Sequence, residues 1–95
     1  MSDPTLLVLA SLAEGEKHGY GMMEDIERFA GVRLGPGTLY GAMTRLEERG
    51  WIRPVPSSDR RQPYTITAAG RKYLEEQVSA LEAIVKTAQR RLKHA

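Results

Sequence analysis

The sequence contains no cysteine, and this absence removes several kinds of chemistry at once. Without cysteine there is no disulfide framework and no thiolate chemistry. The two histidines, His18 and His94, have no partner at the spacing of metal ligands. No apolar run approaches the ~18 residues of a membrane span, and the charged-then-apolar order of a signal peptide is missing. The sequence therefore predicts a cytoplasmic protein with no metal and no other cofactor.

The chain also lacks a set of residues typical of an enzyme. His18, with Glu16 and Glu24 nearby, is the one candidate for acid–base chemistry. A histidine that precedes Gly-Tyr at a helix start is more simply a helix cap or a phosphate contact. We therefore expect no catalytic activity.

The chain is short, which limits how much surface it can bury. At 95 residues it forms one unit, and a unit of this size buries only roughly 60 to 65% of its unfolded surface. A partner chain would add stability, so we expect either a homodimer or a marginally stable monomer.

The charges are unevenly distributed, although the net charge is only +2. Residues 1–32 carry two basic and six acidic side chains, whereas residues 33–61 carry six arginines against three acids. Residues 62–95 carry six basic groups against three acids. Positive charge in the middle and at the end of a chain suits a nucleic-acid partner.

Apolar residues at spacings of three and four predict three short helices in the first half of the chain. Asp3 or Ser2 caps the first helix, which ends near Gly15, and the second spans about 19–30 and stops at Gly31. The third spans 36–49, with proline in its first turn. Their apolar positions are Leu6, Leu7, Leu9, Ala10 and Leu12; Met22, Met23, Ile26 and Phe29; and Leu39, Ala42, Met43 and Leu46.

After Gly50 the pattern changes to short extended runs at 51–53 and 64–67, separated by the polar, proline-flanked PVPSSDRRQP. Residues 32–34 allow no more than a stub of strand. Thr67 can cap a last helix that runs to about Lys93. The predicted fold is therefore mainly α with a small β-hairpin: a winged helix-turn-helix at 1–67, followed by a long C-terminal helix at 68–95.

The stretch GPGTLYGAM, residues 35–43, places glycines at the start of a helix. Such a helix start is found both in dinucleotide-binding sites and in helices that approach a DNA groove. A dinucleotide site would need a preceding buried strand and an acidic residue ~20 positions later, and neither is present. Pro36 also removes a backbone N–H from the turn that would bind pyrophosphate. The alternative is a helix whose bare surface approaches a DNA groove.

A helical projection of 36–49 places the apolar positions inward and a face of small and polar residues outward. Such a face lets the backbone enter the major groove while its side chains supply hydrogen bonds. The alternative is that Gly37 and Gly41 merely allow tight helix packing. The candidate DNA-reading residues are Gly37, Thr38, Tyr40, Gly41, Thr44 and Arg45, with Glu48 at the far end of the same face.

The predicted hairpin tip is polar and basic. Ser57, Ser58, Arg60, Arg61 and Gln62 offer charge and hydrogen-bond donors without an apolar anchor. Such a tip suits a wing along phosphates or in the minor groove, with Arg60 and Arg61 as the DNA contacts; a solvated turn is the alternative.

The last helix carries an apolar repeat that is too long for a small domain. Its steps of 4, 3, 4, 3 and 4 give a period of about 3.5 residues, which is typical of helices that pair. We expect this seam to form a dimer with a second copy, although packing against its own domain is an alternative and Ile84 allows some of it. The seam consists of Leu74, Val78, Leu81, Val85, Ala88 and Leu92.

Three segments, in this order and spacing, carry a family resemblance: HGYGMMEDIE, LGPGTLYGAMTRLEERGWI and RRQPYTITAAGRKYL. Over about residues 5–75 the chain resembles the PadR-like transcriptional regulators. The resemblance implies a winged-helix repressor, usually homodimeric, that binds an inverted repeat in a promoter. It implies Tyr20 as a phosphate contact and Gly37, Thr38 and Tyr40 as groove-facing. Gly41 departs from the bulky or polar residue that is common there, so the base preference stays open.

Two further expectations concern partners. Some PadR-like relatives bind planar hydrophobic compounds between dimer halves. The resemblance therefore allows a small-molecule effector, and the sequence does not identify it. Here the single tryptophan, Trp51, falls at the end of the third helix, where core packing is the favoured role. A winged helix can also serve as a protein-interaction module without specific DNA binding, which would require an apolar outer face on the third helix.

Overall fold

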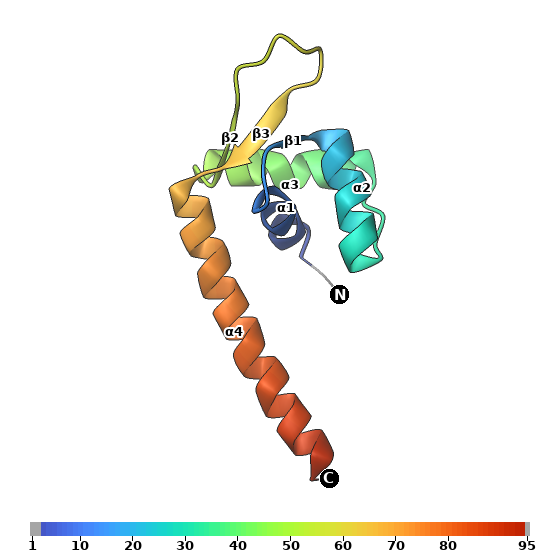
Figure 1. Ribbon diagram of the computed structural model, residues 1–95, viewed down its shortest axis with the longest axis vertical. Coiled ribbons are helices and arrows are strands. Elements are labelled where there is room, and N and C mark those ends of the chain that lie inside the picture. The colour runs from blue at the N-terminus through green and yellow to red at the C-terminus, as the bar shows by residue number, and fades with distance from the viewer. Residues whose placement is uncertain (1–2, 95) are drawn as a thin grey trace.

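The computed structural model describes residues 3–94, and its elements form a winged domain with one projecting helix (Figure 1). Helices α1 (Pro4–Leu12), α2 (Gly19–Ala30) and α3 (Pro36–Glu48) pack together beneath a small sheet. Helix α4 (Ala68–Lys93) starts beside the sheet and runs away from the domain. The predicted winged helix-turn-helix with a long C-terminal helix is confirmed.

The helix ends follow local capping chemistry. Asp3 caps α1, accepting from the backbone N–H of Thr5 at 2.9 Å. Gly31, with a φ of 69°, ends α2 in a left-handed conformation that glycine adopts without strain. Helix α1 ends at Leu12, earlier than predicted, because the chain turns before Gly15 to enter the sheet.

The core is the apolar surface shared by the three short helices and the start of the sheet. Phe29, one of the apolar positions whose spacing predicts α2, is 51% exposed. It lies in the last turn of α2, where the helical period continues but no segment of residues 3–94 covers the ring. The buried apolar residues are Leu7, Val8, Leu9, Leu12, Met22, Met23, Ile26, Leu34, Leu39, Ala42, Met43, Leu46 and Ile52.

The sheet has one strand more than the sequence predicts. β2 (Ile52–Pro54) and β3 (Pro63–Ile66) form the predicted hairpin, each displaced by one residue from the expected range. β1 (Lys17–His18) adds to the other edge of β3, giving the antiparallel order β1-β3-β2. Residues 32–34 are not in a strand. The short third strand fixes His18 beside the wing.

A polar network joins α1, β1 and α2 beneath this strand. The buried Ser11 hydroxyl donates to Asp25 at 2.7 Å, and the Lys17 ammonium lies 3.7 Å from the same carboxylate. Burial raises the pKa of Asp25, but the Ser11 hydrogen bond and the charges of Lys17 and Arg28 outweigh it, so the pKa lies below its usual value. The carboxylate therefore stays ionised and holds β1 to the helices.

The root of α4 is held against the end of α3. Thr67 caps α4 by accepting from the Gly70 N–H at 3.1 Å, and its hydroxyl donates to the Gly50 carbonyl at 2.6 Å. A Cβ at Gly70 would lie 2.1 Å from the Trp51 carbonyl oxygen, so only glycine fits there. Trp51 stacks on Tyr73 with ring centroids 3.8 Å apart. The predicted packing role of Trp51 agrees with this contact.

The rest of α4 projects into solvent. Gly70 is its only buried residue, in a helix that the structure describes from end to end. The molecule measures 56 × 26 × 20 Å, with a radius of gyration of 15.0 Å, against about 12 Å for a compact chain of this length. No helix within residues 3–94 combines the length and apolarity needed to cross a membrane. The projecting helix makes the chain unusually extended for its size.

Candidate nucleic-acid interface

Helix α3 presents the outer face that the helical projection predicts. Leu39, Ala42, Met43 and Leu46 are at most 3% exposed and point into the core. The opposite side is open to solvent, with only Gly41 partly covered. Its exposed residues are Gly37, Thr38, Tyr40, Thr44, Arg45 and Glu48.

The two glycines of this face have no packing role within the described chain. A Cβ at Gly37 would meet nothing within 4 Å among residues 3–94, and one at Gly41 would meet only the Arg45 guanidinium, at 3.7 Å. The tight-packing alternative therefore has no partner helix in the part of the chain that the structure describes. Glycine inside a helix lowers its stability by up to about 1 kcal/mol relative to alanine. The glycine at position 41 therefore needs an explanation other than packing.

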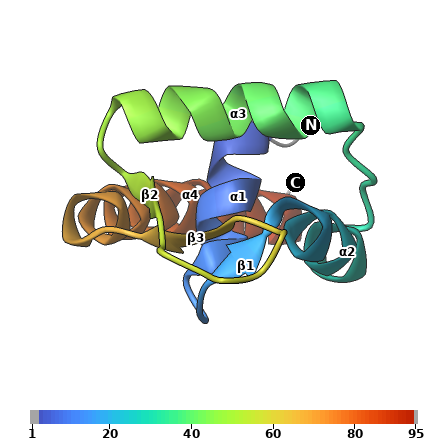
Figure 2. The same cartoon turned by 90° about the horizontal axis from the view of Figure 1, so that it is seen from above.

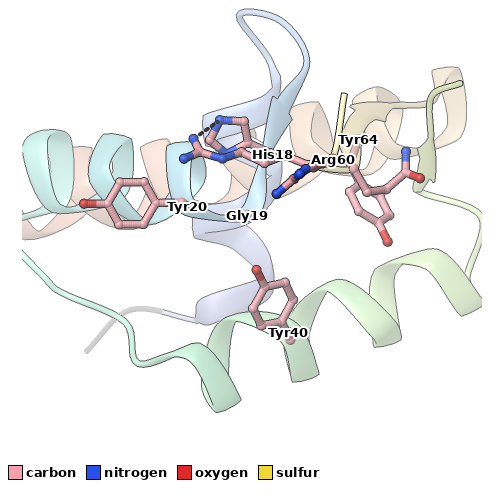
Figure 3. Close-up of a pocket in the computed structure, with 8 residues that line it drawn as sticks. His18, Gly19, Tyr20, Tyr40, Arg60 and Tyr64 are labelled. Atoms are coloured by element: carbon pink, nitrogen blue, oxygen red, sulfur yellow. Dashed lines mark hydrogen bonds between the residues drawn. The ribbon is translucent and has the colours of Figure 1, made fainter. Parts of the chain in front are cut away.

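A cleft of about 480 Å³ separates the start of α3 from the wing (Figure 3). Seen from above, α3 runs along one side of the molecule, while β1 and the wing lie along the other (Figure 2). Four predicted DNA contacts, Tyr20, Tyr40, Arg60 and Arg61, meet here. The full lining is His18, Gly19, Tyr20, Tyr40, Arg60, Arg61, Gln62 and Tyr64.

Tyr40 crosses the cleft toward the beginning of α2. A Cβ built on the buried Gly19 would lie only 2.6 Å from the Tyr40 hydroxyl oxygen, so the ring occupies the space that a side chain would need. Tyr40 nevertheless remains 51% exposed. Gly19 thus sets the position of a predicted DNA contact, a role that sequence reasoning missed because the two residues lie on different helices.

Tyr64 lines the cleft at the base of the wing, where it pairs with Lys17 of β1 and Pro54 of β2. Burial raises the pKa of Tyr64, and the charge of Glu47 and the nearby Tyr40 raise it further. The phenol therefore keeps its proton at neutral pH. Sequence reasoning treated this residue only as part of a strand.

The remaining hydroxyls of the interface are engaged to different degrees. The Thr44 hydroxyl donates to the Tyr40 carbonyl at 2.9 Å, which leaves its lone pairs and methyl group facing outward. Tyr20 is 49% exposed and lines the cleft. The Arg33 guanidinium donates to the Glu27 carboxylate, and this hydrogen bond and the negative charge of Glu27 raise the pKa of Arg33, with a smaller contribution from Tyr20.

The wing between β2 and β3 is held in shape by hydrogen bonds from its own polar side chains. The Gln62 Nε2 donates to the carbonyls of Val55 and Pro63 at 2.7 and 2.9 Å, so its amide hydrogens are not free to donate to DNA. The Ser57 hydroxyl accepts from the Asp59 N–H at 3.0 Å. Arg60 and Arg61 are exposed, and neither forms an ion pair with any residue of 3–94. The wing thus combines a hydrogen-bonded loop with two exposed arginines that form no ion pair within residues 3–94, although Asp59 lies in the same loop.

The predicted dimerisation residues divide into two groups. Leu74 packs, partly buried, against the core of its own domain. The others lie along the projecting part of α4 together with Ile84, which is 64% exposed. The exposed fractions are 44% for Val78, 46% for Leu81, 50% for Val85 and 77% for Leu92, and Ala88 is exposed as well.

A three-helix core, a helix with a bare outer face and a basic wing beside it define a winged-helix, DNA-binding type of protein. Comparison with known sequences gives the family. Residues 8–76 match the model of the Transcriptional regulator PadR-like family, so the chain belongs to that family. Membership of a family of regulators confirms that the chain is not an enzyme.

Two curated relatives share most of this chain. The transcriptional regulator Rv3488 of Mycobacterium tuberculosis is 36% identical over 84 residues, covering 85% of this chain and 78% of the relative. An uncharacterised 37.1 kDa protein in transposon Tn4556 of Streptomyces fradiae is 44% identical over 80 residues, or 84% of this chain. The chain spans only 23% of the length of that second protein.

Solved structures share the architecture. A transcriptional regulator from Clostridium thermocellum has a TM-score of 0.80 and 28% identity, over 92% of this chain and 87% of that one. A PadR family regulator from Clostridium difficile has a TM-score of 0.81 at 24% identity, over 94% and 97% of the two chains, and supports the fold alone.

Proposed function

We propose that the chain is a homodimeric, sequence-specific repressor that binds a palindromic promoter operator. The N-terminal half of α3 enters the major groove, and the wing at 54–63 follows the adjacent backbone. The observation that carries this proposal is the outer face of α3. Within residues 3–94 nothing lies within 4 Å of a Cβ built at Gly37, and only the Arg45 guanidinium, at 3.7 Å, lies near one built at Gly41. Thr38, Thr44 and Arg45 are exposed on the same helix.

Groove entry fits the chemistry of this face. Recognition helices contact base edges with their N-terminal residues, where a bare backbone allows close approach. Thr38 and Thr44 can exchange hydrogen bonds with bases or adjacent phosphates, and Arg45 can bind guanine or a phosphate. A protein-interaction module would instead expose an apolar face, and Tyr40 is the only large apolar side chain exposed on α3.

Pairing of two α4 helices supplies the second half of the proposal. The accessible surface is 6472 Å², whereas a compact monomer of 10.6 kDa exposes about 5,500 Å². Part of this extra surface is the exposed apolar seam from Val78 to Leu92, which a second copy would cover. A two-fold dimer presents its recognition helices one DNA turn, about 34 Å, or a multiple of it apart, which requires a palindromic site.

A DNA titration tests the proposal. A fluorescent duplex from the region upstream of the chain's own gene is titrated with protein, against a scrambled duplex of equal length and composition. We expect the upstream duplex to bind at least about 10³-fold more tightly at physiological salt. Equal affinity for both duplexes contradicts sequence-specific binding, and no binding to either leaves the protein-interaction module as the better reading.

A further inference from the structure

His18 has a defined proton position because of the helix that it caps. Its Nδ1 accepts the backbone N–H of Gly21 at 3.1 Å, and a backbone amide can only donate. Nδ1 therefore carries no proton. A neutral imidazole has one N–H, so that hydrogen lies on Nε2, which becomes a donor directed away from the cap.

The neighbour of Nε2 is another donor. A guanidinium nitrogen of Arg61 lies 3.3 Å from His18 Nε2, as the dashed line in Figure 3 indicates. Guanidinium nitrogens have no acceptor capacity. With Nδ1 occupied by the cap, the two groups cannot satisfy each other. They form a pair of neighbouring donors that one shared acceptor can bridge.

The surroundings specify what kind of acceptor fits. None of the eight residues that line the cleft is acidic, and Arg60 adds a second positive charge. The Tyr40 hydroxyl and the protonated Tyr64 border the same space. The cleft, at about 480 Å³, is open to solvent and large enough for a phosphate group. Water can serve the two donors in the free protein, but an anion accepts from both and offsets the charge.

We propose that His18 Nε2–H and the Arg61 guanidinium jointly bind one phosphate of the DNA backbone, at the junction of the wing and α2. This inference rests on the proposed function and adds His18 to the DNA contacts. His18 acts as a neutral donor and Arg61 as a charged one. Loss of the histidine donor therefore weakens binding without changing its salt dependence, whereas loss of Arg61 changes both.

Substitutions that preserve the helix cap separate this role from folding. Asparagine and aspartate are efficient caps but are too short to place a donor beside Arg61. We expect His18→Asn to unfold near the parent temperature and to bind the upstream duplex about tenfold more weakly, since one hydrogen bond to a charged group is lost. His18→Asp should bind more weakly still, because its carboxylate repels the phosphate.

The salt slope distinguishes the two donors. Arg61→Ala should lower the slope of log K against log salt by about 0.9, as one released counterion requires, while His18→Asn leaves the slope unchanged. Lys86→Ala, which removes a positive charge on α4 far from the cleft, is the matched control and should bind as the parent does. Parent-like affinity of His18→Asn would overturn the proposal and leave the histidine as a cap only.

Nitrogen-15 spectra of the His18 ring give an independent readout. We expect the proton on Nε2 in the free protein and a shift of Nε2 when the duplex binds; a proton on Nδ1, or no shift, overturns the proposal. If the parent bound no duplex, the proposed function would fail, and inorganic phosphate would test the site alone. A phosphate-dependent shift that Arg61→Ala abolishes would support the site, and its absence would refute it.

Discussion

The outer faces of α3 and α4 are both left uncovered by the chain, but their chemistry is opposite. α3 exposes glycine, threonine and arginine beside a basic wing, whereas α4 exposes Val78, Leu81, Ile84, Val85 and Leu92. A small, polar surface suits a hydrated and charged partner, and an apolar seam at heptad spacing suits another helix. The difference supports the proposal that the two faces bind two partners, DNA on α3 and a second copy of the chain on α4.

Disrupting the seam on α4 should have the largest effect on DNA binding. Leu81→Asp with Val85→Asp places two carboxylates where two helices would meet, so we expect a monomer. Operator affinity should fall by about 10²-fold or more, because the second half-site no longer binds intramolecularly. Size-exclusion chromatography with light scattering and a DNA titration measure the two effects.

The control for this substitution lies on the same helix but off the seam. Glu82→Lys changes charge on α4 without touching the exposed apolar residues, and should remain a dimer with intact DNA binding. If the double mutant stayed dimeric, α4 would not hold the copies together. The winged domain should keep its fold in both variants, since α4 contributes only its root to the core.

Removing charge from the wing should have the next largest effect. Replacing Arg60 and Arg61 by alanine leaves the two hydrogen bonds from Gln62 to the wing backbone in place. The salt slope of DNA binding should fall by about one to two units, with weaker affinity on every sequence. An unchanged slope would show that the wing does not touch the phosphates and would confine the DNA-binding surface to α3.

Two glycine substitutions sharpen the contrast between folding and binding. Gly41→Ala meets only Arg45 at 3.7 Å, so it should stabilise the fold by up to about 1 kcal/mol. It should also weaken operator binding about tenfold, because a methyl group enters the groove-facing surface. Gly70→Ala collides with the Trp51 carbonyl and should impair folding itself. Thermal unfolding and DNA titration give both quantities, and unimpaired binding by Gly41→Ala would remove the explanation offered for that glycine.

A single hydroxyl on α3 should have the smallest effect. Thr44→Ala removes an exposed group whose hydrogen already serves the Tyr40 carbonyl, so only its acceptor and methyl contacts are lost. The expected cost is about 1 kcal/mol, with altered preference at one symmetric position in each half-site. A binding-site selection on the variant measures this preference. Unaltered affinity and preference would mean that α3 lies differently in the groove.

Much of this architecture could be predicted because its signals are local. Thr67 at the start of α4, Gly31 at the end of α2 and proline in the first turn of α3 each act within a few residues. The inward positions of α3 follow from its period alone. Local chemistry and helical period thus predicted both outer faces that the structure exposes.

The features that escaped prediction depend on contacts between distant segments. β1 has only two residues and forms because β3 offers it an edge. The importance of Gly19 depends on Tyr40 crossing from another helix. Phe29 fits the period of α2 but is exposed, because periodicity indicates a face and not what covers it. The cleft joins such segments, and so its full lining required the structure.

Sedimentation of the parent protein, alone and with the labelled upstream duplex, tests the assignment of the two faces most directly. We expect a dimer at micromolar concentration without DNA and two chains on each duplex at saturation. A monomer at micromolar concentration, or one chain that occupies the duplex at full affinity, would contradict it.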